Sequence, residues 1–335
     1  MKILLTGGAG YIGSACLRWL LRQGHDPIAY DDLSEGNAAA VPDGRLVIGD
    51  ICDEKLLTET LADRRIEAVI HLAALASVPL SISDPANYWR VNVAGTKGVL
   101  DAMKTAGVRK VVFSSTAATY SFDAEMPIRE TTPQVPQTPY GTTKLAAEWM
   151  IKEYARAYGL TGTIFRYFNA SGADPDGRFG ESRHVEGHLV PLALMVAVGR
   201  RDKLKIFGGD WETRDGTCVR DYVHTDDLAQ AHQLAVEASE TPGEVREYNL
   251  GSGTGTTILE VLRACEAAVG RPIPHEIVGR RPGDPGTLIA TPEKVARELG
   301  WSPQYPNINA IVETAWRWHA SHPDGYPESG QAPRP

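Results

Sequence analysis

Residues 1–32 read MKILLTGGAGYIGSACLRWLLRQGHDPIAYDD, and this stretch decides the fold. Apolar residues run together at 2–6, recur at helical spacing over 11–24 and run together again at 27–30. This pattern predicts a strand, a helix and a second strand. Between the first strand and the helix lies GGAGYIG, in which Gly8, Gly10 and Gly13 complete the spacing G-x-G-x-x-G after Gly7. Asp31 follows directly after the second strand.

A glycine turn between a strand and a helix lets an anion approach the backbone amides at the start of the helix. We therefore expect Gly7, Gly8, Gly10 and Gly13 to hold the pyrophosphate of a dinucleotide. The Asp31 carboxylate would accept hydrogen bonds from the adenosine ribose and repel a 2′-phosphate, which favours NAD over NADP. The alternative is a glycine turn that only packing requires. The turn by itself predicts a cofactor and no particular reaction.

Strands and helices then alternate as far as residue 169. Short apolar runs predict further strands at 45–50, 66–73, 109–115 and 160–169, and helical spacing predicts helices at 53–62, 84–107 and 139–158. Regular alternation of this kind is typical of a parallel sheet with helices on both faces. The predicted fold class is therefore α/β, a Rossmann-type doubly wound parallel sheet followed by a smaller, interleaved α/β substrate domain.

The chain is expected to divide into two interleaved domains. After residue 168 glycine and proline become frequent, and the elements are shorter. We expect 1–168 to form the NAD-binding domain and 218–253 to return to it. The ranges 169–217 and 254–335 are expected to form the second domain, which binds the substrate.

Composition limits the classes of function. The 335 residues carry a formal net charge of −8, and 42% are hydrophobic. An acidic chain does not bind nucleic acid nonspecifically, so we expect no nucleic-acid partner. The apolar run at the N-terminus is too short for a signal peptide, and no stretch has the length of a membrane span, so we expect a cytoplasmic protein with no membrane partner. Cys16, Cys52, Cys218 and Cys265 are far apart and are expected to be buried thiols, and no metal site is expected.

The candidate catalytic residues are Thr116, Tyr140 and Lys144. Tyr140 and Lys144 stand four residues apart in a predicted helix, so both lie on one face, where an ammonium would lower the pKa of the phenol. Thr116 ends a predicted strand, where parallel sheets place their ligands. Because Tyr-x-x-x-Lys occurs by chance, a surface Tyr beside a solvated Lys is the alternative, and the glycine turn and Thr116 weigh against it.

The chain resembles the extended short-chain dehydrogenase/reductase family and, within it, the UDP-glucose (UDP-galactose) 4-epimerases. The motifs that support the resemblance span nearly the whole chain and include, in order, GGAGYIG, GDICD, HLAAL, NVAGT, FSSTAATY, YGTTK, RYFNASGADPDG, DGTCVRDYVH, NLGSG and RPGD. The resemblance implies tightly bound NAD, inversion at C4 of a UDP-sugar through a transient 4-keto sugar, a role in galactose metabolism, and a homodimer.

The resemblance also implies site residues, position by position. Besides the glycines and Asp31, the implied contacts of NAD are Tyr11, Ile12, Asp32, Leu33, Ser34, Gly36, Asp50, Ile51, Leu72, Ala73, Ala74, Ala76, Asn92, Ser114, Tyr140, Lys144 and Phe168. The implied contacts of the UDP-sugar are Thr116, Tyr140, Asn169, His188, Leu189, Lys205, Ile206, Phe207, Arg220, Tyr222, Arg281, Asp284 and Leu288. For the dimer, we expect contact through 84–107 and 139–158, where Tyr88, Trp89, Trp149 and Met150 are expected to be exposed.

The residues after Thr116 bear on the reaction. Dehydrating relatives carry acids there, whereas this chain has Ala117 and Ala118, so elimination would lack its proton donor. Leu288 stands where many epimerases have a bulky Tyr, and this difference leaves the identity of the sugar undecided. The expected substrates are UDP-glucose and UDP-galactose, with UDP-N-acetylhexosamines, UDP-pentoses and UDP-uronic acids as alternatives. A nucleotide-sugar dehydratase or reductase, or a non-enzymatic NAD-binding regulator, remains a further alternative.

Overall fold

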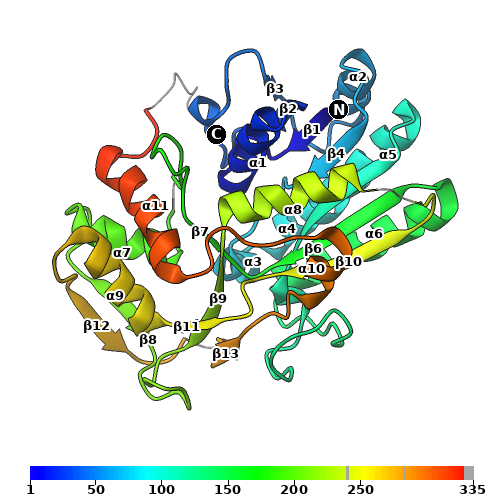
Figure 1. The fold of residues 1–335 in the computed structure, drawn as a ribbon. Coiled ribbons are helices and arrows are strands. Elements are labelled where there is room, and N and C mark those ends of the chain that lie inside the picture. Colours follow the sequence, from blue (N-terminus) through cyan, green and yellow to red (C-terminus); the bar gives the residue numbers. More distant parts are fainter. Residues whose placement is uncertain (184, 239–240, 282–283, 328–335) are drawn as a thin grey trace.

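A parallel sheet forms the centre of the molecule (Figure 1). The computed structural model describes residues 1–183, 185–238, 241–281 and 284–327. Within these ranges the central sheet has seven strands in the order β10-β6-β5-β4-β1-β2-β3, each parallel to its neighbours. The strands are β1 (Lys2–Thr6), β2 (Asp26–Asp31), β3 (Leu46–Ile48), β4 (Ala68–His71), β5 (Lys110–Thr116), β6 (Thr161–Tyr167) and β10 (Val245–Leu250). The predicted doubly wound α/β fold is confirmed.

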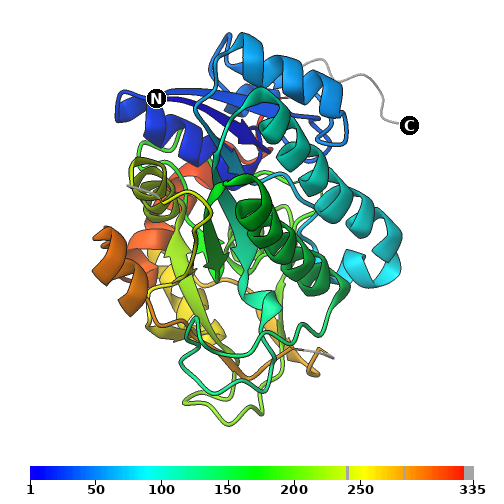
Figure 2. The ribbon, with the colours of Figure 1, turned by 90° about the vertical axis from the view of Figure 1, so that its right-hand side faces the viewer.

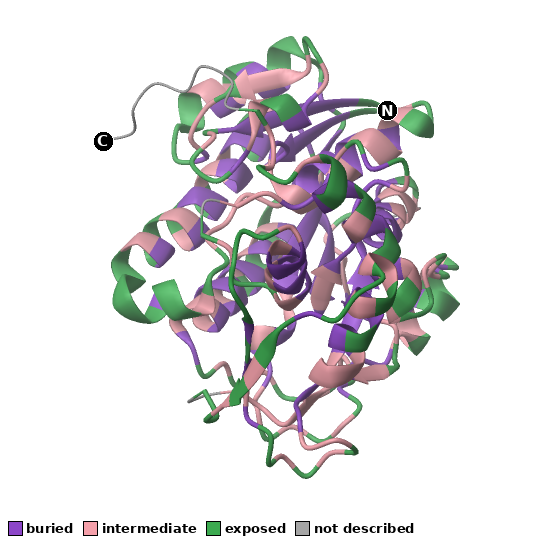
Figure 3. Ribbon diagram, turned by 90° about the vertical axis from the view of Figure 1, so that its left-hand side faces the viewer, coloured by how far each residue is buried: buried purple, intermediate pink, exposed green. Residues whose placement is uncertain are grey.

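Helices cover both faces of this sheet (Figure 2). On one face α1 (Tyr11–Arg22) packs against α8 (Thr225–Glu237), and α2 (Glu54–Asp63), α5 (Thr96–Ala106) and α6 (Pro139–Tyr158) cover the other. Side chains of β1 alternate between the two faces, because Ile3 and Leu5 join the core under α1 whereas Leu4 joins the core under α5. The inner strands β1, β4, β5 and β6 are mostly buried on both sides (Figure 3), whereas the edge strand β3 is partly exposed.

The strand order reverses between β1 and β4. There the loop after β1 touches the loop after β4, since a Cβ built on Gly7 would lie 2.6 Å from the backbone nitrogen of Ala73. In open α/β sheets such a switch point is where a ligand binds, at the carboxyl ends of the strands. A ligand site is therefore expected at the carboxyl ends of β1, β4 and β5.

A second lobe lies beyond these strand ends (Figure 1). Its small sheets are β11-β9-β13 with β7 on β9, and the pair β12-β8. The strands are β7 (Asn169–Ser171), β8 (Leu204–Phe207), β9 (Val219–His224), β11 (Gly255–Thr257), β12 (His275–Val278) and β13 (Thr287–Leu288). The helices are α7 (Leu189–Ala197), α9 (Ile258–Val269) and α11 (Ile308–Ser321), which share one apolar core, and α10 (Glu293–Leu299), which packs on β10.

The segment 218–253 contributes elements to both lobes. Helix α8 packs on α1, and β10 joins the central sheet, as expected for a return to the first domain. Strand β9 instead pairs with β7, β11 and β13 in the second lobe. The division into domains stays a prediction. No helix in the part of the chain that the structure describes is long and apolar enough to cross a membrane.

One expectation about local structure is confirmed with a modification, and one is wrong. The helical stretch predicted at 84–107 runs without a break through α4 (Pro85–Tyr88), a π-helical segment (Trp89–Gly95) and α5, and a separate short helix, α3 (Val78–Ser83), precedes it. The wider turn brings Asn92 into contact with two other elements, described below, and π turns of this kind gather at functional sites. Cys52 is exposed, because it lies in the loop after β3, where its Sγ contacts Arg90.

Candidate active site

The glycine turn after β1 is shaped by close backbone contacts. A Cβ on Gly13 would lie 2.0 Å from the carbonyl oxygen of Gly7, and one on Gly8 would lie 2.6 Å from Cβ of Ala29. Gly7 has a φ of 71°, in the left-handed region that favours glycine. Gly10 is different: its nearest neighbour would be 3.2 Å from an added Cβ, and it caps α1 with no side-chain hydrogen bond. The amides of the first turn of α1 are therefore free of a side-chain cap, as an anion site requires.

Asp31 is tied directly to this turn. Its carboxylate accepts hydrogen bonds from the backbone N–H groups of Ala9 (3.0 Å) and Leu33 (2.9 Å). Burial raises the pKa of the Asp31 carboxyl. The next acid, Asp32, accepts from the backbone N–H and the hydroxyl of Ser34. Two carboxylates at this end of β2 would repel a ribose 2′-phosphate, so the residues present fit NAD.

Other predicted cofactor residues surround this region. Asp50 accepts a hydrogen bond from Arg90 (3.2 Å), and Ile51 is buried beneath the loop after β3. The Tyr11 hydroxyl donates to the carbonyl of Gly172 (2.5 Å), which joins the glycine turn to the second lobe. Phe168 is buried in an apolar cluster next to Tyr120. Their contacts with NAD stay predictions.

Asn92 has a positioning role that the sequence did not reveal. Its amide donates to the carbonyl of Leu75 (3.0 Å) and to Oγ1 of Thr143 (3.1 Å), and its oxygen accepts from the N–H of Leu75 (2.8 Å). Both amide hydrogens are thus used within the protein. Asn92 fixes the loop 72–76, which lies at the switch point, against α6.

Thr116 and Tyr140 are brought together by two turns. Thr116 ends β5, and its Oγ1 accepts a hydrogen bond from the N–H of Ala118 (3.1 Å) in the 3-10 turn Ala117–Thr119. Tyr140 lies in the first turn of α6, which Thr138 caps. Gly141 permits the close approach of the two segments, because a Cβ there would lie 2.2 Å from the carbonyl oxygen of Ala118.

The electrostatics of Tyr140 differ from the expectation. Burial raises the pKa of Tyr140 to about 12, opposed by a hydrogen bond with Thr116 and by the charge of Arg183. We expected Lys144 to lower this pKa. Lys144 is itself buried, at 3% exposure, and burial lowers its pKa to about 7 against the influence of Glu148. The influences on the Tyr140 pKa are burial, Thr116, Tyr88 and Arg183, so the expected lowering by Lys144 is not found.

Tyr88 is a second tyrosine in the site, and its expected exposure is wrong. It is 3% exposed, its hydroxyl donates to the carbonyl of Ser77 (2.5 Å), and its ring meets the ring of Tyr140 edge-on at 6.4 Å between centroids. Tyr88 thus lies directly beside the phenol of Tyr140. Of the other residues expected at the surface, Trp89 and Trp149 are exposed and Met150 is partly buried.

The predicted substrate residues fall into three groups in the second lobe. Asn169, Tyr222, Arg220 and Leu288 share one small sheet, in which Asn169 pairs with Tyr222 and Leu288 with Arg220. The guanidinium of Arg281 lies 4.2 Å above the ring of Phe207, near Lys205 and Ile206 on the same strand; Ile206 is buried at 1% exposure, so only its backbone faces outward. Asp284 lies in the loop between Arg281 and β13, and its charge acts on the Cys218 thiol.

His188 belongs to a third group, which is charged. It stands just before Leu189 at the start of α7, without a capping hydrogen bond from its side chain. Its Nδ1 lies 2.9 Å from Glu181 and 3.1 Å from Glu186, and these carboxylates raise the His188 pKa. Arg183 also pairs with Glu181 (2.7 Å). The charge of Arg183 acts on both Tyr11 and Tyr140.

Comparisons with known proteins agree with this geometry. The model of the NAD dependent epimerase/dehydratase family matches residues 3–251. The UDP-glucose 4-epimerase of Halalkalibacterium halodurans is 48% identical over 326 residues, which covers 97% of this chain and 98% of that protein. The crystal structure of UDP-glucose 4-epimerase from Brucella ovis in complex with NAD has a TM-score of 0.90 at 47% identity, over 94% of this chain and 97% of that one. The enzyme from Bifidobacterium longum, in complex with NAD⁺ and UDP, has a TM-score of 0.92 at 35% identity, over 97% and 100%.

Proposed function

Because this chain belongs to the NAD dependent epimerase/dehydratase family, we propose that it is an NAD-dependent epimerase that inverts C4 of a UDP-sugar, with UDP-glucose and UDP-galactose as the first pair of substrates. The observation that supports the proposal is the approach of Tyr140 on α6 to Thr116 at the end of β5, with Lys144 one helical turn after Tyr140. Ala117 and Ala118 follow Thr116 where an eliminating enzyme would need an acid.

The chain's own residues have distinct tasks in this reaction. Bound NAD supplies an acceptor that takes the C4 hydride and returns it. Tyr140 removes the proton of the 4-hydroxyl and gives it back to the oxygen of the 4-keto sugar, once that sugar has turned its other face. Thr116 holds the same oxygen by a hydrogen bond. The ammonium form of Lys144 favours the phenolate of Tyr140 by opposite charge.

The diphosphate and the uracil of the substrate fit the second lobe. Arg220 and Arg281 offer charge-assisted hydrogen bonds to a diphosphate, and Phe207 offers an aromatic face. These anchors lie away from Tyr140, on β8, β9 and the loop before β13. An anchored diphosphate with a free sugar suits a reaction in which the sugar turns between two hydride transfers.

Product analysis tests the proposed function. The purified protein is incubated with a panel of UDP-sugars, and the anomeric proton signals are followed by NMR. We expect UDP-galactose and UDP-glucose to interconvert, without uptake of solvent deuterium at C4 when the reaction runs in D₂O. A 4-keto-6-deoxy product would instead indicate a dehydratase. Absence of turnover on every sugar would favour a non-enzymatic NAD-binding regulator.

Leu288 is proposed to set the size of the sugar pocket. Its side chain packs against the apolar cluster that contains Tyr120 and Phe168, next to the 3-10 turn that follows Thr116. We expect Leu288→Tyr to narrow the pocket, lowering kcat/KM for a UDP-N-acetylhexosamine at least about tenfold more than for UDP-galactose. Leu288→Met, which keeps the volume, should leave the ratio of the two kcat/KM values unchanged. Equal losses for both substrates in Leu288→Tyr would show that Leu288 does not select the sugar.

We also propose a homodimer, supported by apolar side chains on neighbouring elements. Trp149 on α6 is 59% exposed, and Leu80 and Ile82 on α3, which packs against α6, are 52% and 65% exposed. Light scattering at micromolar concentration should give the mass of a dimer for the wild type and of a monomer for Trp149→Glu. Ile277→Glu, on β12 in the other lobe, is the matched control and should remain a dimer. A monomeric wild type would contradict the proposal.

A cytoplasmic location and a role in galactose metabolism complete the proposal. All four cysteines are free thiols, which suits a reducing compartment. Interconversion of UDP-glucose and UDP-galactose is the chemistry that galactose metabolism would require of this site.

A further inference from the structure

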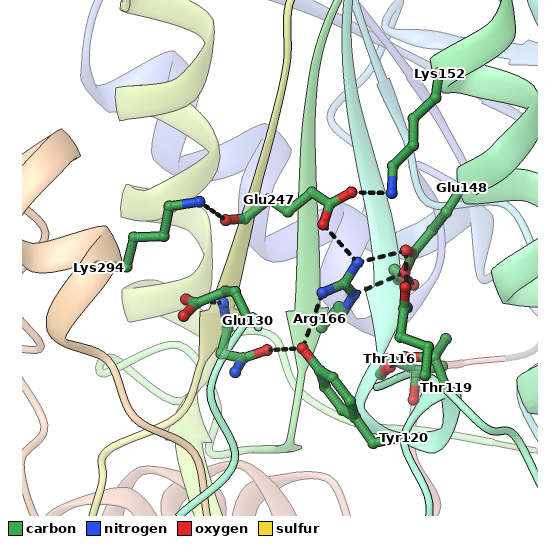
Figure 4. Close-up of polar contacts among 12 residues, drawn as sticks. Thr116, Thr119, Tyr120, Glu130, Glu148, Lys152, Arg166, Glu247 and Lys294 are labelled. Carbon is green, nitrogen blue, oxygen red and sulfur yellow. Dashed lines mark hydrogen bonds and ion pairs between the residues drawn. The ribbon is translucent and has the colours of Figure 1, made fainter. Parts of the chain in front are cut away.

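A buried ion pair lies next to the segment that contains Thr116 (Figure 4). Arg166 on β6 is 1% exposed and Glu148 on α6 is fully buried. The guanidinium donates from Nε to Oε1 of Glu148 (3.0 Å) and from Nη2 to Oε2 (2.7 Å). Burying two charges is costly, and an apolar pair of similar volume is often no less stable. The pair therefore calls for an explanation other than stability.

The Glu148 carboxylate is fixed from three sides. Besides Arg166, it accepts hydrogen bonds from the hydroxyl of Ser115 on β5 and from the side-chain amide of Gln134 (3.0 Å). A bidentate guanidinium and two further hydrogen-bond donors fix the position of this carboxylate. Glu148 is thus a negative charge held at a defined point between α6 and β5.

The same pair holds both ends of the segment that contains Thr116. Ser115, on one side of Thr116, is bonded to Glu148. On the other side, Arg166 donates to the hydroxyl of Tyr120 (2.9 Å), which in turn donates to Asn249 on β10 (2.8 Å). Within the segment, the Thr119 hydroxyl donates to the carbonyl of Thr116 (3.0 Å). The backbone of Thr116 is therefore held at its two flanks by one ion pair.

Glu148 also stands one helical turn after Lys144, on the same face of α6. Tyr140 stands one turn before Lys144 on the same helix. The groups that interact with Lys144 are Glu148 on its own helix, His71 on β4 and the ring of Phe113 on β5, whose centroid lies 4.3 Å from Nζ. His71 is kept neutral, because burial and the charge of Lys144 lower its pKa to about 3. The anion among these neighbours is Glu148, and it opposes the lowering of the Lys144 pKa by burial.

Beyond Glu148, the surrounding charges are Arg166 on β6, Glu247 on β10 and Lys152 on α6. Arg166 also contacts Glu247 (3.0 Å), and Lys152 pairs with Glu247. Glu247 is therefore a second carboxylate on the same guanidinium (Figure 4). It provides a matched control for Glu148.

We propose that Glu148, held by Arg166, is a positioning residue that aligns Thr116 on β5 with Tyr140 and Lys144 on α6 and supplies the fixed negative charge that keeps Lys144 an ammonium. The consequence for the reaction rests on the proposed epimerase function. Glu148 acts through its neighbours and touches no reacting atom.

The test removes the charge of Glu148 and follows Lys144. Lys144 assists as an ammonium, so activity falls as the pH rises through the Lys144 pKa. Without the Glu148 carboxylate the Lys144 pKa is lower, and this loss of activity therefore begins at a lower pH. We expect Glu148→Gln to shift the basic limb of the kcat profile downward by about one pH unit. The lysine ¹³Cε NMR titration of the same holoenzyme, assigned with Lys144→Met, should show the Lys144 midpoint moving in the same direction.

Glu247→Gln is the control, because it removes a carboxylate from Arg166 but leaves the contacts of Ser115 and Lys144. Glu247→Gln should leave both the basic limb of the kcat profile and the titration midpoint of Lys144 unchanged, whatever its effect on Tm. Equal shifts in the two variants, or no shift in Glu148→Gln, would overturn the proposed electrostatic role. If wild-type protein epimerises no UDP-sugar, the proposed function fails, while the NMR midpoints still decide the role of Glu148.

Two further variants keep the proposal testable if Glu148→Gln does not fold. Glu148→Asp keeps the charge but shortens its reach, so the Lys144 midpoint should stay while kcat falls several-fold. Ser115→Ala keeps every charge and removes one contact beside Thr116, so kcat should fall several-fold with unchanged KM for the UDP-sugar. Wild-type kcat in both variants would overturn the alignment role.

Discussion

Replacing Tyr140 by Phe is expected to lower kcat by roughly a hundredfold to ten-thousandfold, the usual loss on removal of a general base. The substitution removes one hydroxyl, the group that the structure places in hydrogen-bond contact with Thr116. NAD content and affinity for the UDP-sugar should change little, because the ring and its packing remain. Steady-state kinetics with UDP-galactose, together with extraction and quantification of bound NAD, measure these outcomes.

The matched control is Tyr88→Phe. Tyr88 lies edge-on to Tyr140, and its hydroxyl is bonded to the carbonyl of Ser77. Loss of a neutral hydrogen bond costs about 0.5–1.5 kcal/mol, which corresponds to about tenfold at most. A Tyr140→Phe enzyme that keeps more than about a tenth of wild-type kcat would show that this phenol is not the base.

Gly13→Ala is expected to remove NAD from the protein and to destabilise the fold, whereas Gly10→Ala should remove NAD alone. At Gly13 an added Cβ would lie 2.0 Å from the Gly7 carbonyl oxygen, and this backbone contact cannot relax without moving the start of α1. Overpacking of this kind costs about 1–3 kcal/mol. At Gly10 the nearest atom would be 3.2 Å away, so the fold tolerates the methyl group, but the methyl group occupies the approach to the α1 amides.

The measurement compares NAD content after purification with the Tm of the NAD-free proteins. Wild-type protein should carry NAD through purification, because the proposed reaction regenerates the cofactor in every cycle. The NAD-free form of Gly10→Ala should keep the wild-type Tm, and that of Gly13→Ala should melt several degrees lower. Gly10→Ala protein that retains stoichiometric NAD would contradict the proposed place of the pyrophosphate. Recovery of NADP from the wild type would refute the argument from Asp31.

By itself, the sequence determined the elements and the order in which they alternate. Strands β1, β5 and β6 each contain a short apolar run, and α1 and α6 have apolar residues at helical spacing between recognisable ends, so local patterns suffice to place them. The glycine turn, Asp31, Thr116 and the pair Tyr140 and Lys144 were found in the same way. Each lies at the end of an element, where sequence position fixes location in a parallel sheet.

Only the tertiary structure decided how these residues influence one another. Tyr88 and Cys52 were assigned the wrong exposure, because burial depends on which distant segment packs against a residue: Ser77 and Tyr140 enclose Tyr88, whereas the loop of Cys52 stays open. Spacing suggested that Lys144 lowers the pKa of Tyr140, but burial is the largest influence on both groups, raising the pKa of Tyr140 and lowering that of Lys144. Glu148 lies within the same helix as both, yet its partner Arg166 comes from β6 and its neighbour Ser115 from β5. Burial and long-range pairing arise from the folded chain as a whole, and no local pattern in the sequence encodes them.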